Sequence, residues 1–310
     1  MTTLLDRAEP ADTPKAAPAG GGGTWVRSLG RATVTVWRTL NANLTAQIGV
    51  WLFVTVALMA IFAPLIATHD PLDQDLFARL TGPTAEHWLG TDGFGRDIWS
   101  RIVYGARISL VIGLLAVLIA MVVGTVLGVV AGYFGGWVDQ IISQGTDILL
   151  AFPSLILGLM VVAVLGPSME NLVAAITLTT IPQFVRVARA PTIALRERDY
   201  VQACKALGYS PVRTMGIHIL PNILPEVLVM ASLWLATAIR VEASLAFIGL
   251  GVKPPTPTWG GMIREGFENV LTSPWLAVWP SIAILVVVFA LNMIGDGLRD
   301  AVDPRMKGGH

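Results

Sequence analysis

Four long runs of the sequence contain no aspartate, glutamate, lysine or arginine, and this pattern constrains the fold more than any other feature. The runs are Leu44 to Thr68, Ile108 to Gly132, Ile148 to Gly166 and Trp275 to Gly295. A helix of roughly 20 apolar residues crosses the hydrocarbon core of a bilayer, where no water is present to satisfy backbone groups. One such run could be a buried helix of a large soluble protein. Four of them in a chain of 310 residues indicate an all-α membrane protein.

The overall composition agrees with a membrane protein and excludes several other classes. Hydrophobic residues make up 54% of the chain and charged residues only 14%, whereas soluble domains contain about a quarter charged residues. The formal net charge is zero, so nothing indicates binding to nucleic acid. The single cysteine, Cys204, excludes an internal disulfide and a cysteine-based zinc site, and the four histidines offer no helical metal-binding pair. We therefore expect no metal site.

The chain divides into a tail, a membrane-embedded core and a loop that carries its own helix. Residues 1–24 lack the apolar core of a cleavable signal peptide, and their composition predicts a disordered cytoplasmic tail. In residues 25–43 the arginines share one helical face, which predicts an amphipathic helix in the membrane interface, with a solvated basic helix as the alternative. The other expected segments are the first transmembrane helix (44–68), a polar periplasmic segment (69–107), a transmembrane core (108–300) with a cytoplasmic loop (191–221), and a cytoplasmic tail (301–310).

We expect about six spanning helices, and the second, from Ile108 to Tyr133, has the clearest pattern. Gly124, Gly128 and Gly132 recur every four residues along one of its faces. Small residues at this spacing allow two helix backbones to approach closely, which is how helices pack in lipid. The three glycines are therefore predicted to be a helix-packing surface.

Prolines make two of the other spanning helices less regular. Pro153 is predicted to kink the third helix. Pro182 is predicted to interrupt the fourth, which is expected only from Asn171 to Val185. The fifth is expected from Val227 to Val252, and the sixth is the last of the four uncharged runs.

The distribution of lysine and arginine predicts the orientation of the chain. With both termini in the cytoplasm, the cytoplasmic segments hold 14 of these residues and the outer segments hold 6. The opposite topology would reverse this ratio and break the positive-inside rule. Both termini are therefore expected to be cytoplasmic.

A two-turn helix is predicted within the cytoplasmic loop. Asp199 and Gln202 have the spacing of a capping box, Gly208 stands where a left-handed residue ends a helix, and Pro211 prevents continuation. Ala203 and Ala206 give the helix a partly small surface. A short rigid helix of this kind suits docking into a groove on another protein, although an ordinary loop helix that binds nothing stays equally open on physical grounds.

The same loop resembles a motif of known transporters. Gln202-Ala203-Cys204-Lys205-Ala206-Leu207-Gly208, followed after nine residues by His218-Ile219-Leu220-Pro221, is similar to the EAA loop of binding-protein-dependent ABC importers. The usual motif has Glu, Ala and Ile where this chain has Gln202, Cys204 and His218. Gln202 can still act in a capping box, and Cys204 is small enough to preserve the fit.

Three further stretches resemble one branch of that family, the second membrane subunit of the dipeptide and oligopeptide permeases. They are Leu89 to Leu110, Glu242 to Gly260 and Asn292 to Arg305, and with the loop they extend the resemblance over about residues 45 to 305. The resemblance implies the ABC importer permease fold, with a cytoplasmic coupling helix that docks an ATPase. The coupling residues it implies are Asp199, Tyr200, Gln202, Ala203, Cys204, Lys205, Ala206, Leu207 and Gly208.

The resemblance also implies partners and a location. These are a homologous membrane subunit, one or two ABC ATPase subunits and an extracytoplasmic substrate-binding protein, assembled in the bacterial inner membrane. The substrate stays open between dipeptides, oligopeptides, nickel complexes and certain sugars.

No ATPase activity is expected of the chain itself. None of its four lysines lies in a phosphate-binding Gly-x-x-x-x-Gly-Lys-Ser/Thr loop, so ATP and magnesium are expected on partner subunits and no cofactor on this chain. The alternative from another class is a self-contained ion-coupled carrier or channel. The absence of a convincing internal repeat disfavours that alternative.

Three ionisable residues are candidates for the translocation path. Arg240 and Glu242 lie within a predicted spanning helix, where an ionisable group costs several kcal/mol unless paired or hydrated. Asp147 lies near the cytoplasmic start of the third helix. Arg240 and Glu242 could equally serve structural ion pairs, and for Asp147 the structural interpretation is favoured. The segment 92–97 does not have EF-hand spacing, so we expect a turn there.

Overall fold

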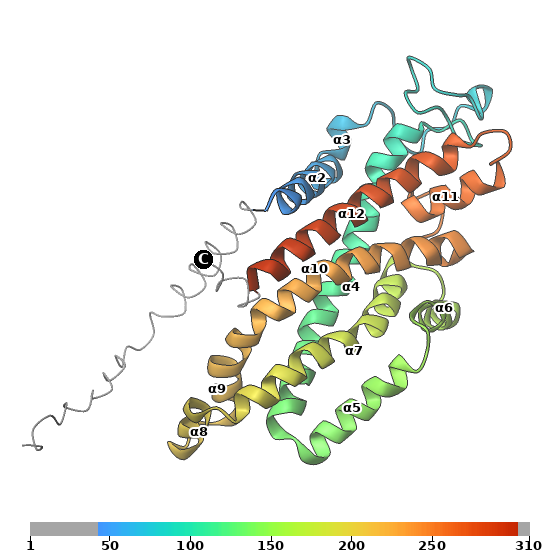
Figure 1. Ribbon diagram of the computed structural model, residues 1–310. Coiled ribbons are helices and arrows are strands. Elements are labelled where there is room, and N and C mark those ends of the chain that lie inside the picture. The colour runs from blue at the N-terminus through green and yellow to red at the C-terminus, as the bar shows by residue number, and fades with distance from the viewer. Residues whose placement is uncertain (1–42, 303–310) are drawn as a thin grey trace, which may run out of the picture.

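The computed structural model describes residues 43–302 of the protein, whose regular structure is helical apart from an isolated bridge between Thr91 and Asp97 (Figure 1). The predicted N-terminal tail, nearly all of the predicted interfacial helix and all but two residues of the C-terminal tail lie outside the described residues. The elements are α2 (Leu44–Ile61), α3 (Ala63–Ile66), η1 (Leu76–Ala78), α4 (Ile98–Phe134), α5 (Gly136–Leu150), α6 (Ser154–Leu165), α7 (Met169–Arg196), α8 (Asp199–Ala206), α9 (Pro211–Thr214), η2 (Met215–Ile219), α10 (Leu220–Leu245), η3 (Ala246–Leu250), α11 (Trp259–Glu268) and α12 (Trp275–Val302).

Five helical stretches in the described part of the chain are long and apolar enough to cross a membrane. They are α2, α4, α7, the run from α9 to η3 and α12. The helices α5 and α6 pass the same test only as a pair, and they meet at an angle of 89°. Pro153 stands directly before α6, so the predicted kink is a complete break between two helices.

The direction of the chain shows how this bent pair connects its neighbours. Gly124 of α4 lies against Phe184 of α7, and Gly132 lies against Thr192, so the two helices run in the same direction. The α5–α6 pair must therefore return the chain from the end of α4 to the start of α7. Counted as one crossing, it brings the number of spans to six.

Four helices extend beyond their predicted bounds; among them, α10 begins at Leu220 instead of Val227, and α12 continues past Gly295 to Val302. The helix expected from Ile108 begins at Ile98, where the side chain of Asp97 accepts a hydrogen bond from the Ser100 N–H at 2.8 Å. The prediction that Pro182 interrupts the fourth helix is wrong, because α7 continues through it to Arg196. Spanning helices tolerate proline where neighbouring helices shield the freed carbonyl, and Pro182 is buried.

The interior of the bundle is formed mainly by α4, α7 and α10, and α2 packs on α12 beside them. A methyl group placed on Gly49 of α2 would lie 2.8 Å from the carbonyl oxygen of Ala290 in α12. Trp259 of α11 is 1% exposed, and its indole N–H donates to the carbonyl of Ile102 at 3.0 Å. This bond fixes α11 against the first turns of α4.

The bundle has two distinct ends. One end carries α8 and α9, and the other carries α11 and the loop 67–97 between α3 and α4 (Figure 1). These are called the α8 end and the α11 end. The helix α4 extends from one to the other.

Candidate coupling helix and the pocket at the opposite end

The helix α8 begins one residue earlier than predicted, and its start lacks the predicted capping box. Arg198 occupies the N-cap position in an extended conformation, and Asp199 is the first helical residue. The Gln202 side chain donates its N–H to the carbonyl of Arg196 at 3.0 Å instead of reaching the cap. The prediction of a capping box was wrong. Only two residues separate α7 from α8, so the Gln202 amide bonds the last carbonyl of α7 instead.

The end of α8 has the geometry that its sequence predicts. Gly208 adopts a left-handed backbone with φ of 74°. Its N–H donates to the Lys205 carbonyl, and the Tyr209 N–H donates to the Cys204 carbonyl, both at 3.0 Å. These two bonds form a Schellman motif, which ends the helix abruptly and defines its length.

One face of α8 is buried and the other is available for contact. Val201 and Cys204 face inward. Leu207, which follows the last turn, is an apolar side chain with 73% of its surface exposed. The exposed residues of the predicted coupling segment are Asp199, Tyr200, Gln202, Ala203, Lys205, Ala206, Leu207 and Gly208.

Contacts of α8 and of the adjoining end of α7 connect it to three spanning segments. The Lys205 ammonium lies 5.4 Å from the ring centroid of Tyr133, near the end of α4. Arg196, the last residue of α7, donates to the carbonyls of Gly132 and Tyr133 at 3.3 Å. The rings of Tyr200 and His218 lie 6.4 Å apart, which links α8 to η2. A displacement of α8 therefore reaches α4, α7 and the start of α10 directly.

The predicted packing glycines of α4 lie against α7. Methyl groups placed on Gly124, Gly128 and Gly132 would lie 2.5–2.8 Å from atoms of α7. For Gly128 the nearest atom is the carbonyl oxygen of Val185, at 2.5 Å. Only glycine permits this approach of the two backbones, so α4 and α7 are held together as a close pair.

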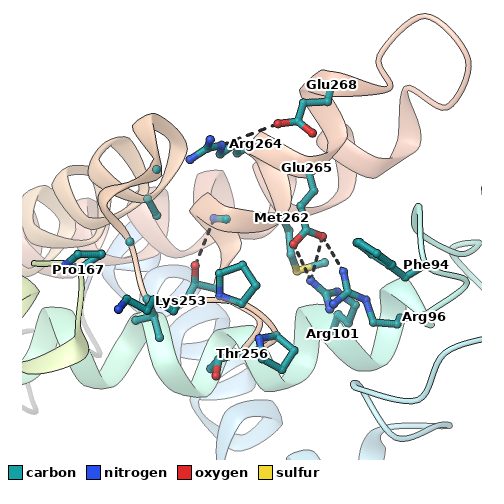
Figure 2. Close-up of a pocket in the computed structure, with 18 of the residues that line it drawn as sticks. Phe94, Arg96, Arg101, Pro167, Lys253, Thr256, Met262, Arg264, Glu265 and Glu268 are labelled. Carbon is teal, nitrogen blue, oxygen red and sulfur yellow. Dashed lines mark hydrogen bonds and ion pairs between the residues drawn. The ribbon is translucent and has the colours of Figure 1, made fainter.

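A pocket of about 550 Å³ opens at the α11 end (Figure 2). Its walls come from the loop before α4, the first turns of α4, the segment after η3, and α11. Its charged lining residues are Arg96, Arg101, Lys253, Arg264, Glu265 and Glu268.

Two buried arginines form the floor of this pocket. The side chains of Arg96 and Arg101 are 3% and 2% exposed, and each places an Nη2 atom 3.0 Å from Glu265 Oε2. The Arg96 Nε atom also lies 2.7 Å from Asp92 Oδ2. Figure 2 shows Glu265 reaching from α11 across to the two guanidinium groups. The ion pairs join the loop, α4 and α11.

The guanidinium group of Arg101 is not fully hydrogen-bonded. Arg101 Nη1 is buried and has no hydrogen-bond partner within residues 43–302. Lys253 and Arg264, which also line the pocket, are exposed. The pocket therefore offers several cations together with the carboxylates of Glu265 and Glu268, a combination suited to a small molecule with charged groups.

The structure does not bring together the three residues predicted for a translocation path. Arg240 is exposed, and its Nη2 donates to Thr237 Oγ1 at 3.0 Å. Glu242 is fully buried beside Ser109. Asp147 is exposed and pairs with Arg186 at 2.8 Å. None of the three predicted residues lines the pocket at the α11 end.

The ion pairs in the pocket were not predicted from the sequence. Arg96 and Glu265 are 169 positions apart, and no periodicity or spacing relates them. The only available signal is that an arginine in the first turns of an apolar helix, such as Arg101, requires a partner. The sequence alone does not identify that partner.

Two family models match the sequence. Residues 124–308 match the binding-protein-dependent transport system inner membrane component. Residues 33–83 match the N-terminal transmembrane domain of oligopeptide transport permease C. The first match includes α8 and its loop.

Curated relatives and a solved structure agree with these matches. The dipeptide transport system permease protein DppC of Alkalihalophilus pseudofirmus is 46% identical over 278 residues, which cover 88% of this chain and 91% of the relative. The glutathione transport system permease protein GsiD of Shigella flexneri is 41% identical over 273 residues, covering 88% and 90%. The inward-facing MetNI methionine ABC transporter contains a chain of similar fold, with a TM-score of 0.53, 17% identity and coverage of 66% and 98%.

Proposed function

This chain belongs to the family of binding-protein-dependent transport system inner membrane components, and from that membership we propose that α8 is the helix through which an ATPase drives transport. The protein is a multi-pass inner-membrane permease subunit of an ABC importer. Such systems include an ATPase and a binding protein, and the permease subunit itself is not catalytic and carries no cofactor. Family membership decides against the self-contained ion-coupled carrier.

The proposed orientation places the α8 end in the cytoplasm. The segments at that end, with the two termini, hold 14 lysines and arginines, against 6 in the segments assigned to the outside. ATP is available in the cytoplasm, so an ATPase can reach α8 only with this orientation. The pocket at the α11 end then faces the outside, where a binding protein would deliver solute.

The exposed surface of α8 is the observation that carries the docking proposal. Ala203 and Ala206 are exposed small residues, and Leu207 adds an exposed apolar side chain beside them. The Schellman motif at Gly208 fixes the helix end, so little conformational entropy would be lost when a partner binds. A rigid helix with a small surface can enter a groove on the ATPase.

The proposed transport step is a rigid-body switch between two packings of the bundle. ATP binding to the partner would displace α8, and the contacts of Lys205 and Arg196 with the end of α4 would pass that displacement to α4 and α7. A homologous membrane subunit would form the other half of the path. The energy for the switch comes from binding on another chain.

We propose short peptides as the substrate class. The two relatives are named for dipeptides and for glutathione, itself a short peptide. Short peptides carry at least one carboxylate and one ammonium group, and the pocket at the α11 end offers guanidinium groups together with carboxylates. Lys253 and Arg264, the exposed cations of the pocket, are the donors within reach of a peptide carboxylate.

The docking proposal is tested by placing a charge on the small surface of α8. We expect Ala203→Glu to insert in the membrane normally but to retain at least about tenfold less ATPase on co-purification, the equivalent of ~1.4 kcal/mol. ATP-dependent uptake should fall with it. The matched control is Ala85→Glu, the same change at an exposed alanine of the opposite end. Wild-type amounts of bound ATPase and wild-type uptake in the Ala203 variant would contradict the proposal.

A further inference from the structure

Two histidines far apart in the loop 67–97 converge on one aspartate at the α11 end. His69 follows α3, His87 lies within the loop, and Asp97 is the N-cap residue of α4. Each can offer one ligand atom such that all three atoms lie within 4.8 Å of one another. We propose that this His69–His87–Asp97 cluster binds a divalent transition-metal ion, with zinc as the best fit.

The two oxygens of the Asp97 carboxylate have different partners. Its Oδ2 accepts hydrogen bonds from the Ser100 N–H at 2.8 Å and from the Thr68 hydroxyl at 3.3 Å. Its Oδ1 faces the histidines, 3.0 Å from His87 Nδ1 and 4.0 Å from His69 Nδ1. One oxygen is therefore anchored by the helix start while the other is presented to two imidazole rings. Hydrogen bonds that orient a ligating carboxylate in this way are typical of metal sites.

A hydrogen-bonded loop without an ion would need only one of the two histidines. The bond between His87 and Asp97 already satisfies Oδ1, and His69 is too distant from that oxygen for a hydrogen bond. The His69 Nδ1 atom lies 3.0 Å from the Thr68 hydroxyl, which can donate to Asp97 instead when a metal takes the imidazole. The two rings lie with their centroids 4.7 Å apart. A shared ion explains why both rings gather at one carboxylate oxygen.

The distances are close to those of a zinc site. Bonds of about 2.0–2.2 Å place tetrahedral donors roughly 3.4 Å apart. The separations of 3.0 and 4.0 Å from Asp97 lie on either side of this value, and the two histidine nitrogens lie within 4.8 Å of each other, so a shift of His69 by about 1 Å brings its distance to Asp97 into the range of a zinc site. His69 lies in a bend and its side chain is 34% exposed, so it is free to make that shift.

The chemistry of the donors selects the class of ion. Two imidazoles with one carboxylate favour zinc and its neighbours among the transition metals over calcium and magnesium, which prefer oxygen ligands. The Asp97 side chain is fully buried and that of His87 is 14% exposed, so an ion would reach the cluster past His69. Bound there, the ion would join the end of the α3 segment to the start of α4 and hold the loop in place. This structural role is separate from the transport cycle.

Metal binding to the full-length chain, purified with its partner subunits and without a histidine tag, tests the inference. After removal of metal with a chelator, equilibrium dialysis against zinc should give one ion per chain. His69→Gln should lower the affinity at least about tenfold, because it removes one of three ligands. Asp97→Asn should also lower it while preserving the helix cap, since asparagine is a good N-cap residue. Cobalt should bind at the same site and give visible absorption bands of a tetrahedral complex.

The matched control is His218→Gln, which removes a histidine at the α8 end. It should bind zinc as the wild type does. The His69 side chain bonds only the neighbouring Thr68 hydroxyl among the described residues, and its backbone bond to Ser100 does not depend on the side chain, so the variant is expected to fold, which thermal unfolding without metal will verify. Equal zinc binding by the wild type and His69→Gln, or no binding by the wild type, would overturn the inference.

Discussion

At the scale of single residues, the buried charge of Arg101 is stable inside the bundle only because carboxylates surround it. Its Nη2 lies 3.0 Å from Glu265, and its Nε lies 3.3 Å from Asp92. Removing one partner of a buried ion pair leaves an uncompensated charge, which costs far more than an exposed pair contributes. Two glutamates of α11 allow this difference to be measured.

We expect Glu265→Gln to lower the free energy of unfolding by about 2 kcal/mol. A fully buried pair would cost ~3–5 kcal/mol, and the lower figure allows for the 34% exposure of Glu265. The control is Glu268→Gln, which loses only an exposed pair with Arg264 at 3.9 Å and should change stability by less than about 0.5 kcal/mol. The thermal unfolding midpoints of the purified variants provide the measurement. Equal midpoints for the two variants would show that the buried ion pairs contribute nothing.

At the scale of helices, the pairing of α4 with α7 depends on backbone approach and not on large side chains. The α4 glycines bring the carbonyl of Val185 within 2.5 Å of where a side chain would begin. Any added atom must push the two helices apart, and tightly packed interfaces resist such a change. This contact also carries the proposed coupling, so its disruption should affect both folding and transport.

Gly128→Ala should destabilise the protein by about 1–3 kcal/mol, because its methyl group meets the α7 backbone. Gly145→Ala on α5 is the matched control, since nothing lies within 4 Å of the added methyl group there. Alanine is the better helix former, so that variant should gain up to ~1 kcal/mol. Denaturation of both variants in detergent measures the difference. A Gly128 variant as stable as the control would mean that α4 and α7 do not pack so closely.

Sequence patterns predicted the features that depend on residues close together in the chain. The glycine spacing on α4 and the end of α8 at Gly208 follow from residues within a few turns of one another. The continuation of α7 through Pro182 depends on neighbouring helices that shield the proline. Likewise, the meeting of His69, His87 and Asp97 depends on the path of a loop. These features are set by tertiary contacts, which a single sequence does not reveal.

At the scale of the whole molecule, the α8 end is coupled to the bundle through Arg196. Its guanidinium donates to two carbonyls at the end of α4 and so fastens α7 and α4 together beside α8. The proposed docking of an ATPase uses the exposed surface of α8, which does not include Arg196. Docking and transmission are therefore expected to be separable by mutation.

Arg196→Gln should keep the ATPase bound but reduce solute uptake per ATP hydrolysed several-fold, because the displacement of α8 no longer reaches α4 firmly. Arg198→Gln removes the same charge from an exposed position two residues away and should leave this ratio unchanged. Uptake and ATP hydrolysis measured together in proteoliposomes give the ratio. A parallel loss of bound ATPase in the Arg196 variant would argue against separate docking and transmission.

The length of α4 has a mechanical consequence. Its 37 residues form a continuous helix roughly 55 Å long, with Arg101 in the first turns and Tyr133 in the last. A tilt of about 5° around its midpoint would move each tip by roughly 2.4 Å, more than the tolerance of a hydrogen bond. In the proposed orientation, the pocket at the α11 end and the surface that docks the ATPase would then move together, because one rigid helix joins the two sides of the membrane.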